Sequence, residues 1–230
     1  MTPDQFKEIF KKTKNDPNQL VYLRKIILKF LADGILSESK GTNVLLKETG
    51  TWASGAGFPK AAQGHSAGEY MFLKVSDMNL PKNEKYIVSA NNYISQDLRD
   101  KLRAKIHPAG TIIFPKIGGA IATNKRRILT KPSAIDNNCL GLVPNEDIHG
   151  DWLYFILLGI DFAQYQSGTA TPALRQSVIG EIQLYKPDTI EEQKRIAAKV
   201  EELMALCDEL EIANQKKSSI QDDLLKHLIA

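Results

Sequence analysis

The 230-residue chain is poor in the residues that metal sites and disulfide frameworks require. It has only two cysteines, Cys139 and Cys207, which lie far apart and match no metal-ligand spacing. No His-x-x-x-His or Cys-x-x-Cys pair accompanies its four scattered histidines, His65, His107, His149 and His227. We therefore expect no metal site, and a reduced, cytoplasmic chain.

Long apolar runs are also missing. The longest, Trp152–Ile160, is too short to cross a bilayer, and the N-terminus lacks a signal-peptide pattern. An apolar fraction of 43% and a charged fraction of 25% are those of a soluble folded protein, so we expect no membrane association. The length allows one ordinary domain plus an extension, or two small domains.

Motifs of common enzymes are absent as well. There is no Walker A sequence, and the Gly-x-Gly at residues 55–57 lacks the third glycine of a nucleotide loop. The Asn/Asp-Pro-Pro-aromatic tetrapeptide of amino-methyltransferases does not occur. Asp188 and Glu192 superficially imitate a nuclease, but they lie at the start of one helix, where the helix dipole explains acidic residues. The sequence predicts a non-enzyme without its own cofactor. A nuclease that uses Asp188 and Glu192 is an alternative.

The pattern that is present predicts an α+β fold with one globular domain flanked by long helices. We place a helical segment at residues 1–40, the globular domain at 41–187 and a long helix at 188–230. In the first segment, Asp16 and Pro17 are typical of a helix start and Gly34 of a helix end. Apolar residues at helical spacing lie between them: Leu20, Leu23, Ile27 and Phe30. A shorter helix is expected earlier, around Phe6, Ile9 and Phe10.

Glycines and prolines interrupt the middle segment, and its β-like runs are short. We expect strands at Tyr70–Val75, Tyr86–Val88, Thr111–Phe114, Arg127–Leu129 and Ser177–Leu184. The uninterrupted apolar run Trp152–Ile160 favours a buried helix, with Asp151 as its N-cap.

The third segment is predicted to be a coiled-coil-like helix. Thr189 and Glu192 have capping-box spacing at its start. A heptad seam then steps by four, three, four and three through Ile196, Val200, Leu203, Cys207 and Leu210. Asn214 and Lys217 continue the seam, where polar residues can fix register. A single apolar stripe needs a partner, so the two helical segments could pair with each other or with another chain.

Charge is unevenly distributed along the chain. Residues 49–187 carry fifteen Lys/Arg against eleven Asp/Glu, whereas residues 188–230 carry six against ten. A basic middle suits a polyanion such as DNA, although a solubilising surface would look similar. The densest cluster, 116–131, combines glycines with phosphate binders and base-edge readers. The candidate DNA-binding residues are Lys60, Lys116, Asn124, Lys125, Arg126, Arg127 and Arg175. The alternative for the cluster is a hairpin whose turn is merely polar.

Several stretches resemble one known family. Residues Thr189–Ile196 read Thr-Ile-Glu-Glu-Gln-Lys-Arg-Ile and continue through Lys199–Glu211. This stretch is similar to the start of the spacer helix in specificity (S) subunits of Type I restriction–modification systems. Phe72–Met78 and Gly110–Lys116 resemble the body of a target-recognition domain in that family. Leu23–Leu36 resembles the end of a spacer helix that leads into such a domain, so the resemblance covers most of the chain.

The resemblance implies a non-catalytic, sequence-specific subunit that binds double-stranded DNA and directs modification and restriction subunits to it. In such systems the methyltransferase subunits methylate adenine with S-adenosylmethionine, and the restriction subunits use ATP and Mg²⁺. A usual S subunit has two recognition domains, and this chain has room for one. We therefore expect a half-sized form that acts as a homodimer on a gapped palindrome. A coiled-coil interaction adaptor without DNA specificity is the alternative.

Overall fold

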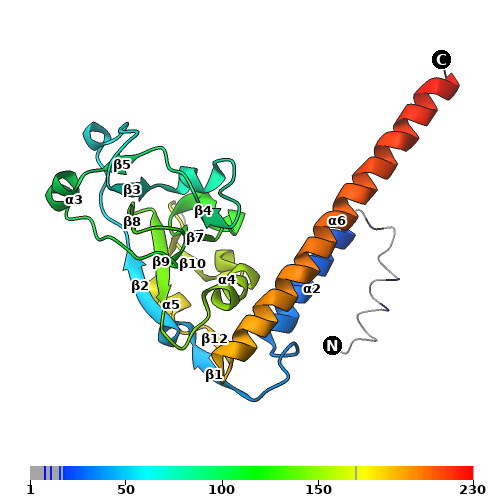
Figure 1. Ribbon diagram of the computed structural model, residues 1–230, viewed down its shortest axis with the longest axis horizontal. Helices are drawn as coiled ribbons and strands as arrows, with labels where there is room; N and C mark the ends of the chain where they lie inside the picture. The colour runs from blue at the N-terminus through cyan, green and yellow to red at the C-terminus, as the bar shows by residue number, and fades with distance from the viewer. Residues whose placement is uncertain (1–7, 9–10, 12–15, 17, 169, 230) are drawn as a thin grey trace.

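The computed structural model describes residues 8, 11, 16, 18–168 and 170–229, with the side chains of 222–229 left out. It consists of a β-rich domain and a stem of two helices, α2 (Gln19–Ala32) and α6 (Ile190–Ile229). Figure 1 shows α6 extending far past the domain, with α2 lying along its first half. None of the helices described is long and apolar enough to cross a membrane. The short helix expected around Phe6 lies outside the described residues.

Helix α2 follows the predicted apolar pattern, and its side chains Leu23, Ile27 and Leu31 are buried. Its start differs from the prediction, because Asn18 rather than Asp16 occupies the N-cap position. The Asp16 carboxylate instead accepts a hydrogen bond from the Asn18 backbone N–H at 2.7 Å. Gly34 has a φ of +70° just after the helix end, which is the left-handed conformation that glycine favours there.

Two small sheets form the domain. The five-stranded sheet has the order β2-β9-β6-β7-β4, and the three-stranded sheet has the order β5-β3-β8. In the larger sheet the strands are β2 (Gly50–Ser54), β9 (Cys139–Pro144), β6 (Ile112–Pro115), β7 (Arg127–Leu129) and β4 (Tyr86–Ile87). In the smaller sheet they are β5 (Tyr93–Ile94), β3 (Tyr70–Leu73) and β8 (Ser133–Ile135). The four strands expected between residues 70 and 129 are therefore present, each close to its expected bounds.

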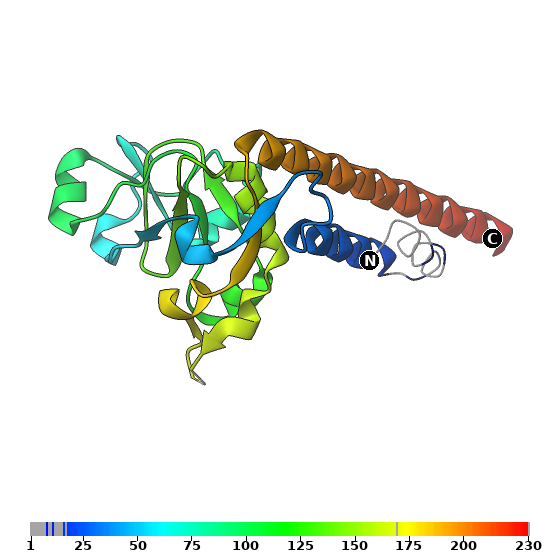
Figure 2. The ribbon, with the colours of Figure 1, turned by 90° about the horizontal axis from the view of Figure 1, so that it is seen from below.

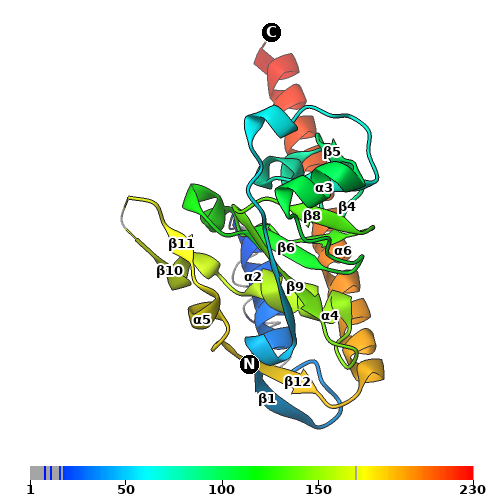
Figure 3. The same ribbon diagram turned by 90° about the vertical axis from the view of Figure 1, so that its left-hand side faces the viewer.

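The domain is closed by a strand from each of its ends. Strand β1 (Gly41–Leu45) pairs antiparallel with β12 (Gln183–Pro187), so that Gly41 lies opposite Pro187. A small hairpin of β10 (Gln166–Ser167) and β11 (Ala173–Leu174) projects from the domain in Figure 3. The helices α3 (Gln96–Leu102) and α5 (Gln176–Ile179) are short. The single strand expected over 177–184 was thus wrong, because α5 and a turn precede β12.

Helix α4 (Gly150–Gly159) joins the domain to the stem, since it packs against both α2 and α6. All side chains from Trp152 to Leu157 are buried, which explains the uninterrupted apolar run. The predicted N-cap was displaced by two residues: His149 has that position, and Asp151 lies in the first turn.

The start of α6 shows half of the expected capping box. The Glu192 backbone N–H donates to Thr189 Oγ1 at 3.2 Å, but the Glu192 carboxylate does not return to Thr189. It accepts instead from the Glu38 backbone N–H at 2.7 Å and from Arg195, which ties α6 to the segment after α2. Glu192 therefore fastens the two helices of the stem together at their base.

The seam of α6 is covered within the chain for most of its length. Ile196, Val200 and Cys207 are 2%, 0% and 4% exposed, and Leu203 packs against the same core. Leu210 is 41% exposed and lies beyond the covered part. Figure 2 shows α2 running beside α6 from the domain outward. Of the two predicted pairings, the helical segments pair with each other along this part of the seam.

Candidate nucleic-acid interface

Loops from both sheets lie at one edge of the domain, because β3, β6 and β8 end there and β9 begins there. Leu73 of β3 lies opposite Ile135 of β8, and Pro115 of β6 lies opposite Cys139 of β9. An isolated bridge between Ala56 and Asp136 joins the two sheets at this edge. We call the resulting surface the loop edge; it comprises residues 55–66, 74–76, 116–119, 136–138 and 170–175.

Backbone contacts hold these loops together. The Leu174 N–H donates to the Lys116 carbonyl at 2.9 Å, and the Gly118 N–H donates to the Pro172 carbonyl at 2.7 Å. Gly55 crosses so close to Asp136 that a Cβ would lie 1.9 Å from the Asp136 carbonyl oxygen. Only glycine permits that crossing, so the sequence fixes the approach of the two segments.

The charge of the loop edge is one-sided. It carries four permanent cations, Lys60, Lys74, Lys116 and Arg175, against the single carboxylate of Asp136. Asp136 is only 4% exposed, and it accepts hydrogen bonds from the backbone and side-chain amides of Asn138. The exposed part of the edge is thus free of negative charge, which suits a phosphate backbone.

The loop edge also offers amides and open backbone. Asn137 and Asn138 are both exposed, and asparagine is a common reader of adenine edges. Gly57, Gly118 and Gly119 have open space where a Cβ would be, and Gly118 has a φ of +75°. A polyanion can therefore approach the backbone of Gly57 and Gly119 closely, whereas the Gly118 N–H already donates to the Pro172 carbonyl.

The structure separates the predicted DNA-binding residues into two groups. Lys60, Lys116 and Arg175 lie on the loop edge, where Lys60 and Arg175 are exposed and Lys116 is half-buried. Asn124, Lys125, Arg126 and Arg127 lie elsewhere, between the sheet and the C-terminal end of α4.

For Arg126 the prediction of a DNA contact was wrong. This side chain is 1% exposed and lies against the rings of Phe114 and Phe162, with its guanidinium carbon 4.2 Å from the Phe162 ring centroid. Burial lowers its pKa to about 9. Its donors reach the carbonyl oxygens of Leu157, Lys125 and Ile160 and the side chain of Asn124. Arg126 therefore caps free carbonyls at the C-terminal end of α4.

The neighbours of Arg126 also bond within the fold, Asn124 to the end of α4 and the other two to residues 78–79. Asn124 adopts a φ of +51° and donates from Nδ2 to the Leu158 carbonyl at 2.8 Å. Half-buried Arg127 donates to the Met78 carbonyl at 2.8 Å, and Lys125 contacts the Asn79 side chain. Asn124 and Arg127 thus hold backbone carbonyls, and because both are only half-buried their assignment as DNA-binding residues stays a prediction.

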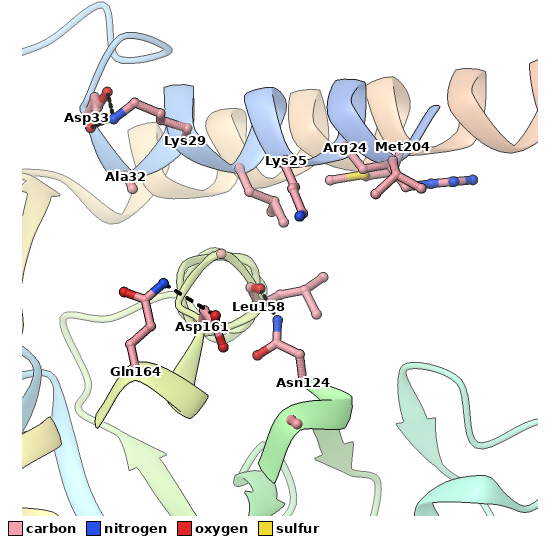
Figure 4. A pocket seen from close by; sticks show the side chains of 14 residues that line it. Arg24, Lys25, Lys29, Ala32, Asp33, Asn124, Leu158, Asp161, Gln164 and Met204 are labelled. Carbon is pink, nitrogen blue, oxygen red and sulfur yellow. Dashed lines mark hydrogen bonds and ion pairs between the residues drawn. The ribbon is translucent and has the colours of Figure 1, made fainter. Parts of the chain in front are cut away.

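A groove of about 840 Å³ lies between the stem and the domain, on a different surface from the loop edge. Figure 4 shows α2 on one side of it and Asn124, Leu158, Asp161 and Gln164 on the other. Its cations are largely paired: Arg24 bonds to Asp208 and Glu211, and Lys29 bonds to Asp33. The groove therefore lacks the one-sided charge of the loop edge.

Sequence reasoning missed Lys74, Asn137 and Asn138. The run Asp136-Asn137-Asn138 between two apolar strands was a visible signal, because polar residues at strand ends are typical of binding loops. Lys74 gave no signal, since its place at the edge follows from the pairing of β3 with β8. Across the residues that the structure describes, no group of three or more metal-ligating side chains comes together.

Comparisons with known proteins agree on one family and one fold. The family model for the Type I restriction modification DNA specificity domain matches residues 39–221. No curated protein matches the chain significantly by sequence.

Solved structures give the same fold at low identity. The chain is similar to a structure described under the structural basis of complex assembly and conformational transition of the type I R-M system. The TM-score is 0.68, and the identity is 12% over 96% of this chain and 54% of that one. It is similar to the HsdS subunit from Thermoanaerobacter tengcongensis, with a TM-score of 0.62 and 13% identity over 91% of this chain and 49% of that one. It is also similar to the S subunit from M. genitalium, with a TM-score of 0.56 and 16% identity over 97% of this chain and 57% of that one. The chain thus spans about half the length of these relatives.

Proposed function

The chain belongs to the family of Type I restriction modification DNA specificity domains, and from this premise we propose that it recognises DNA through its loop edge. The observation that carries the proposal is the one-sided charge of that edge, which has four cations and a single, buried carboxylate. Lys60, Lys116 and Arg175 would bind phosphates there, and Asn137 and Asn138 would contact base edges. The bound DNA would be one short half-site.

We further propose that two copies act together. The chain spans about half of its structural relatives, so one copy supplies one recognition domain. The exposed end of α6 offers a surface for the second copy, because residues 212–221 are all exposed. There, Leu206, Leu210, Ala213, Lys217 and Ile220 step by four, three, four and three along one face. Leu206, Leu210 and Ile220 are 47%, 41% and 51% exposed.

A symmetric dimer joined through this face would carry two identical domains at a fixed separation. Each α6 has forty residues, which correspond to about 60 Å of helix. A two-fold axis through the paired helices inverts one half-site relative to the other, so the target would be a gapped palindrome. The protein would then direct methyltransferase and restriction subunits to this target, and those partners would supply S-adenosylmethionine, ATP and Mg²⁺ chemistry.

Selection from random duplex DNA tests the proposal. The full chain is used alone and together with methyltransferase subunits of the same system, and enriched duplexes are sequenced. We expect two identical, inverted half-sites at one fixed spacing. A single half-site would retain DNA recognition and reject the dimer. No enrichment by folded protein in either arm would reject DNA recognition and favour an interaction adaptor.

A further inference from the structure

The junction between domain and stem is built differently at the two ends of α4. At its C-terminal end, Leu158 and Gly159 border the open groove that separates α2 from the domain (Figure 4). At its N-terminal end, Asp151 takes part in a compact ionic contact centred on Lys85. The C-terminal end packs on α2, where a Cβ on Gly159 would lie 3.2 Å from the Leu28 Cβ, whereas the N-terminal end adds a specific ionic contact.

Lys85 joins three elements at that closed end. It directly precedes β4, and its Nζ lies 3.0 Å from Asp151 Oδ1 of α4 and 2.7 Å from Glu201 Oε1 of α6. The same ammonium lies 5.0–5.6 Å from the ring centroids of Tyr86, Tyr154 and Phe155. Its side chain is only 18% exposed. Burial acts to lower the pKa of Lys85, but its bonds to Glu201 and Asp151 outweigh burial and raise that pKa above its ordinary value.

The position of Glu201 along α6 gives this contact a geometric role. The base of α6 is held by Gln193, which accepts from the His149 N–H at 2.7 Å and donates to the Asp147 carbonyl at 3.1 Å. Glu201 lies eight residues further along, or about 12 Å. Buried Ile196 and Val200 also pack α6 against the core over this stretch, but apolar packing is non-directional, whereas an ion pair fixes one point of the helix against the domain. Among the ion pairs of the described residues, Lys85–Glu201 is the only one between residues 41–187 and α6.

We propose that Lys85 is a positioning residue that fixes the direction in which α6 leaves the recognition domain, and thereby the gap between half-sites. The inference rests on the proposed function, because the gap exists only if two domains bind DNA together. One base pair corresponds to about 3.4 Å along the duplex, so a small rotation at the base of a long helix changes the preferred gap.

The test compares Lys85→Met with Lys47→Met in the selection experiment with the full chain. Lys47 makes an ion pair of similar length, 2.6 Å to Glu181, but that pair lies within the domain. We expect Lys85→Met to select the same half-site bases while its preference for the wild-type gap over gaps one base pair longer or shorter falls roughly five-fold. Lys47→Met should keep the wild-type gap. A wild-type gap distribution in Lys85→Met would overturn the inference.

A second variant and a second measurement separate this inference from DNA recognition itself. Glu201→Gln removes the same ion pair from a carboxylate whose side chain is 59% exposed, so it tests the contact even if Lys85→Met fails to fold. Spin labels at the exposed positions 101 and 215, which lie off the proposed dimer stripe, report the distance between domain and helix without DNA. The labelled chain is diluted with unlabelled chain so that only distances within one chain are measured. Both variants should broaden that distribution. Distributions as narrow as wild type would reject the role of Lys85, whereas absent enrichment by wild-type protein would reject the proposed function.

Discussion

At the scale of single residues, charge in the sequence did not distinguish a DNA contact from a structural one. Arg126 and Arg175 are both arginines in polar, glycine-containing surroundings, yet one is buried against two aromatic rings and the other is exposed. The difference depends on the end of α4, which lies more than thirty positions away from Arg126. Pairing of distant segments, and not local composition, decides which cation faces solvent.

Arg126→Ala should therefore destabilise the protein. The change removes the Arg126 donor from the Ile160 carbonyl, leaves the Leu157 carbonyl with only the Ile160 N–H, and opens a cavity beside two rings. The free energy of unfolding should therefore fall by about 3 kcal/mol or more. Urea unfolding measures the loss. Where the variant remains folded, its base preference should equal that of wild type; an altered preference at one base would restore Arg126 as a DNA contact.

For the cations of the loop edge we predict an effect on DNA binding, whereas for Arg126 we predict an effect on stability. Lys116→Ala and Arg175→Ala should each weaken binding to all sequences and reduce the slope of log affinity against log salt by about one, because each removes a phosphate contact. Titrations at several salt concentrations measure the slope. Lys101→Ala, on α3 after β5, is the matched control, since it lies past the other end of β3 and should leave the slope unchanged.

A base reader behaves differently from a phosphate binder. Asn137→Ala should cost about 1–3 kcal/mol at one base position and leave the salt slope unchanged, because the lost contact carries no charge. Binding to a set of single-base variants of the selected half-site measures this. Equal losses on all of these duplexes would show that Asn137 contacts the backbone instead.

At the scale of elements, regular patterns were predictable and their partners were not. The apolar periods of α2 and α6 located both helices, but short β-like runs located only four of the eight strands in the two main sheets, missing β2, β5, β8 and β9. The seam of α6 could not reveal which helix covers it, because a helix of the same chain and one of another chain satisfy the same pattern. The capping box is a second case in which the partner was not predictable. The Glu192 carboxylate accepts hydrogen bonds from Ser37 and Glu38, far away in the sequence, and not from the Thr189 backbone N–H.

Glu192 should make the base of the stem sensitive to acid. Arg195, then the Glu38 N–H and Ser37, lower the pKa of Glu192 to about 2 despite burial, which acts to raise it. A carboxylate with a depressed pKa in the fold stabilises it above the ordinary value near 4.5, and that stabilisation is lost as pH falls towards 2.

Glu192→Gln provides the comparison. Urea midpoints at pH 5 and pH 3 should differ more for wild type than for this variant, since the variant cannot lose a charge at position 192. Glu202→Gln is a suitable control, because the Glu202 carboxylate is 60% exposed in an ion pair within one helix. Equal pH dependence in wild type and Glu192→Gln would show that other carboxylates dominate acid destabilisation.

At the scale of the whole molecule, the proposed dimer predicts a difference between two faces of α6. Ile220→Asp places a charge in the exposed stripe and should raise the dimer dissociation constant more than roughly a hundred-fold, because an isoleucine is lost from each copy. Ile212→Asp is the control, since Ile212 lies off the stripe and is 65% exposed. Light scattering after size exclusion measures the mass. A dimer that survives Ile220→Asp would place the association surface elsewhere.

Residues 41–187 separate the two helices of the stem, and this arrangement has a consequence during synthesis. The apolar face of α2, with Leu23, Ile27 and Leu31, leaves the ribosome roughly 170 residues before the part of α6 that covers it. At about 5–20 residues per second, that interval is on the order of ten seconds or more. The nascent chain therefore exposes the apolar face of α2 until α4, and later α6, has been made. A chaperone that holds unfolded chains would have a defined target in this helix during that interval.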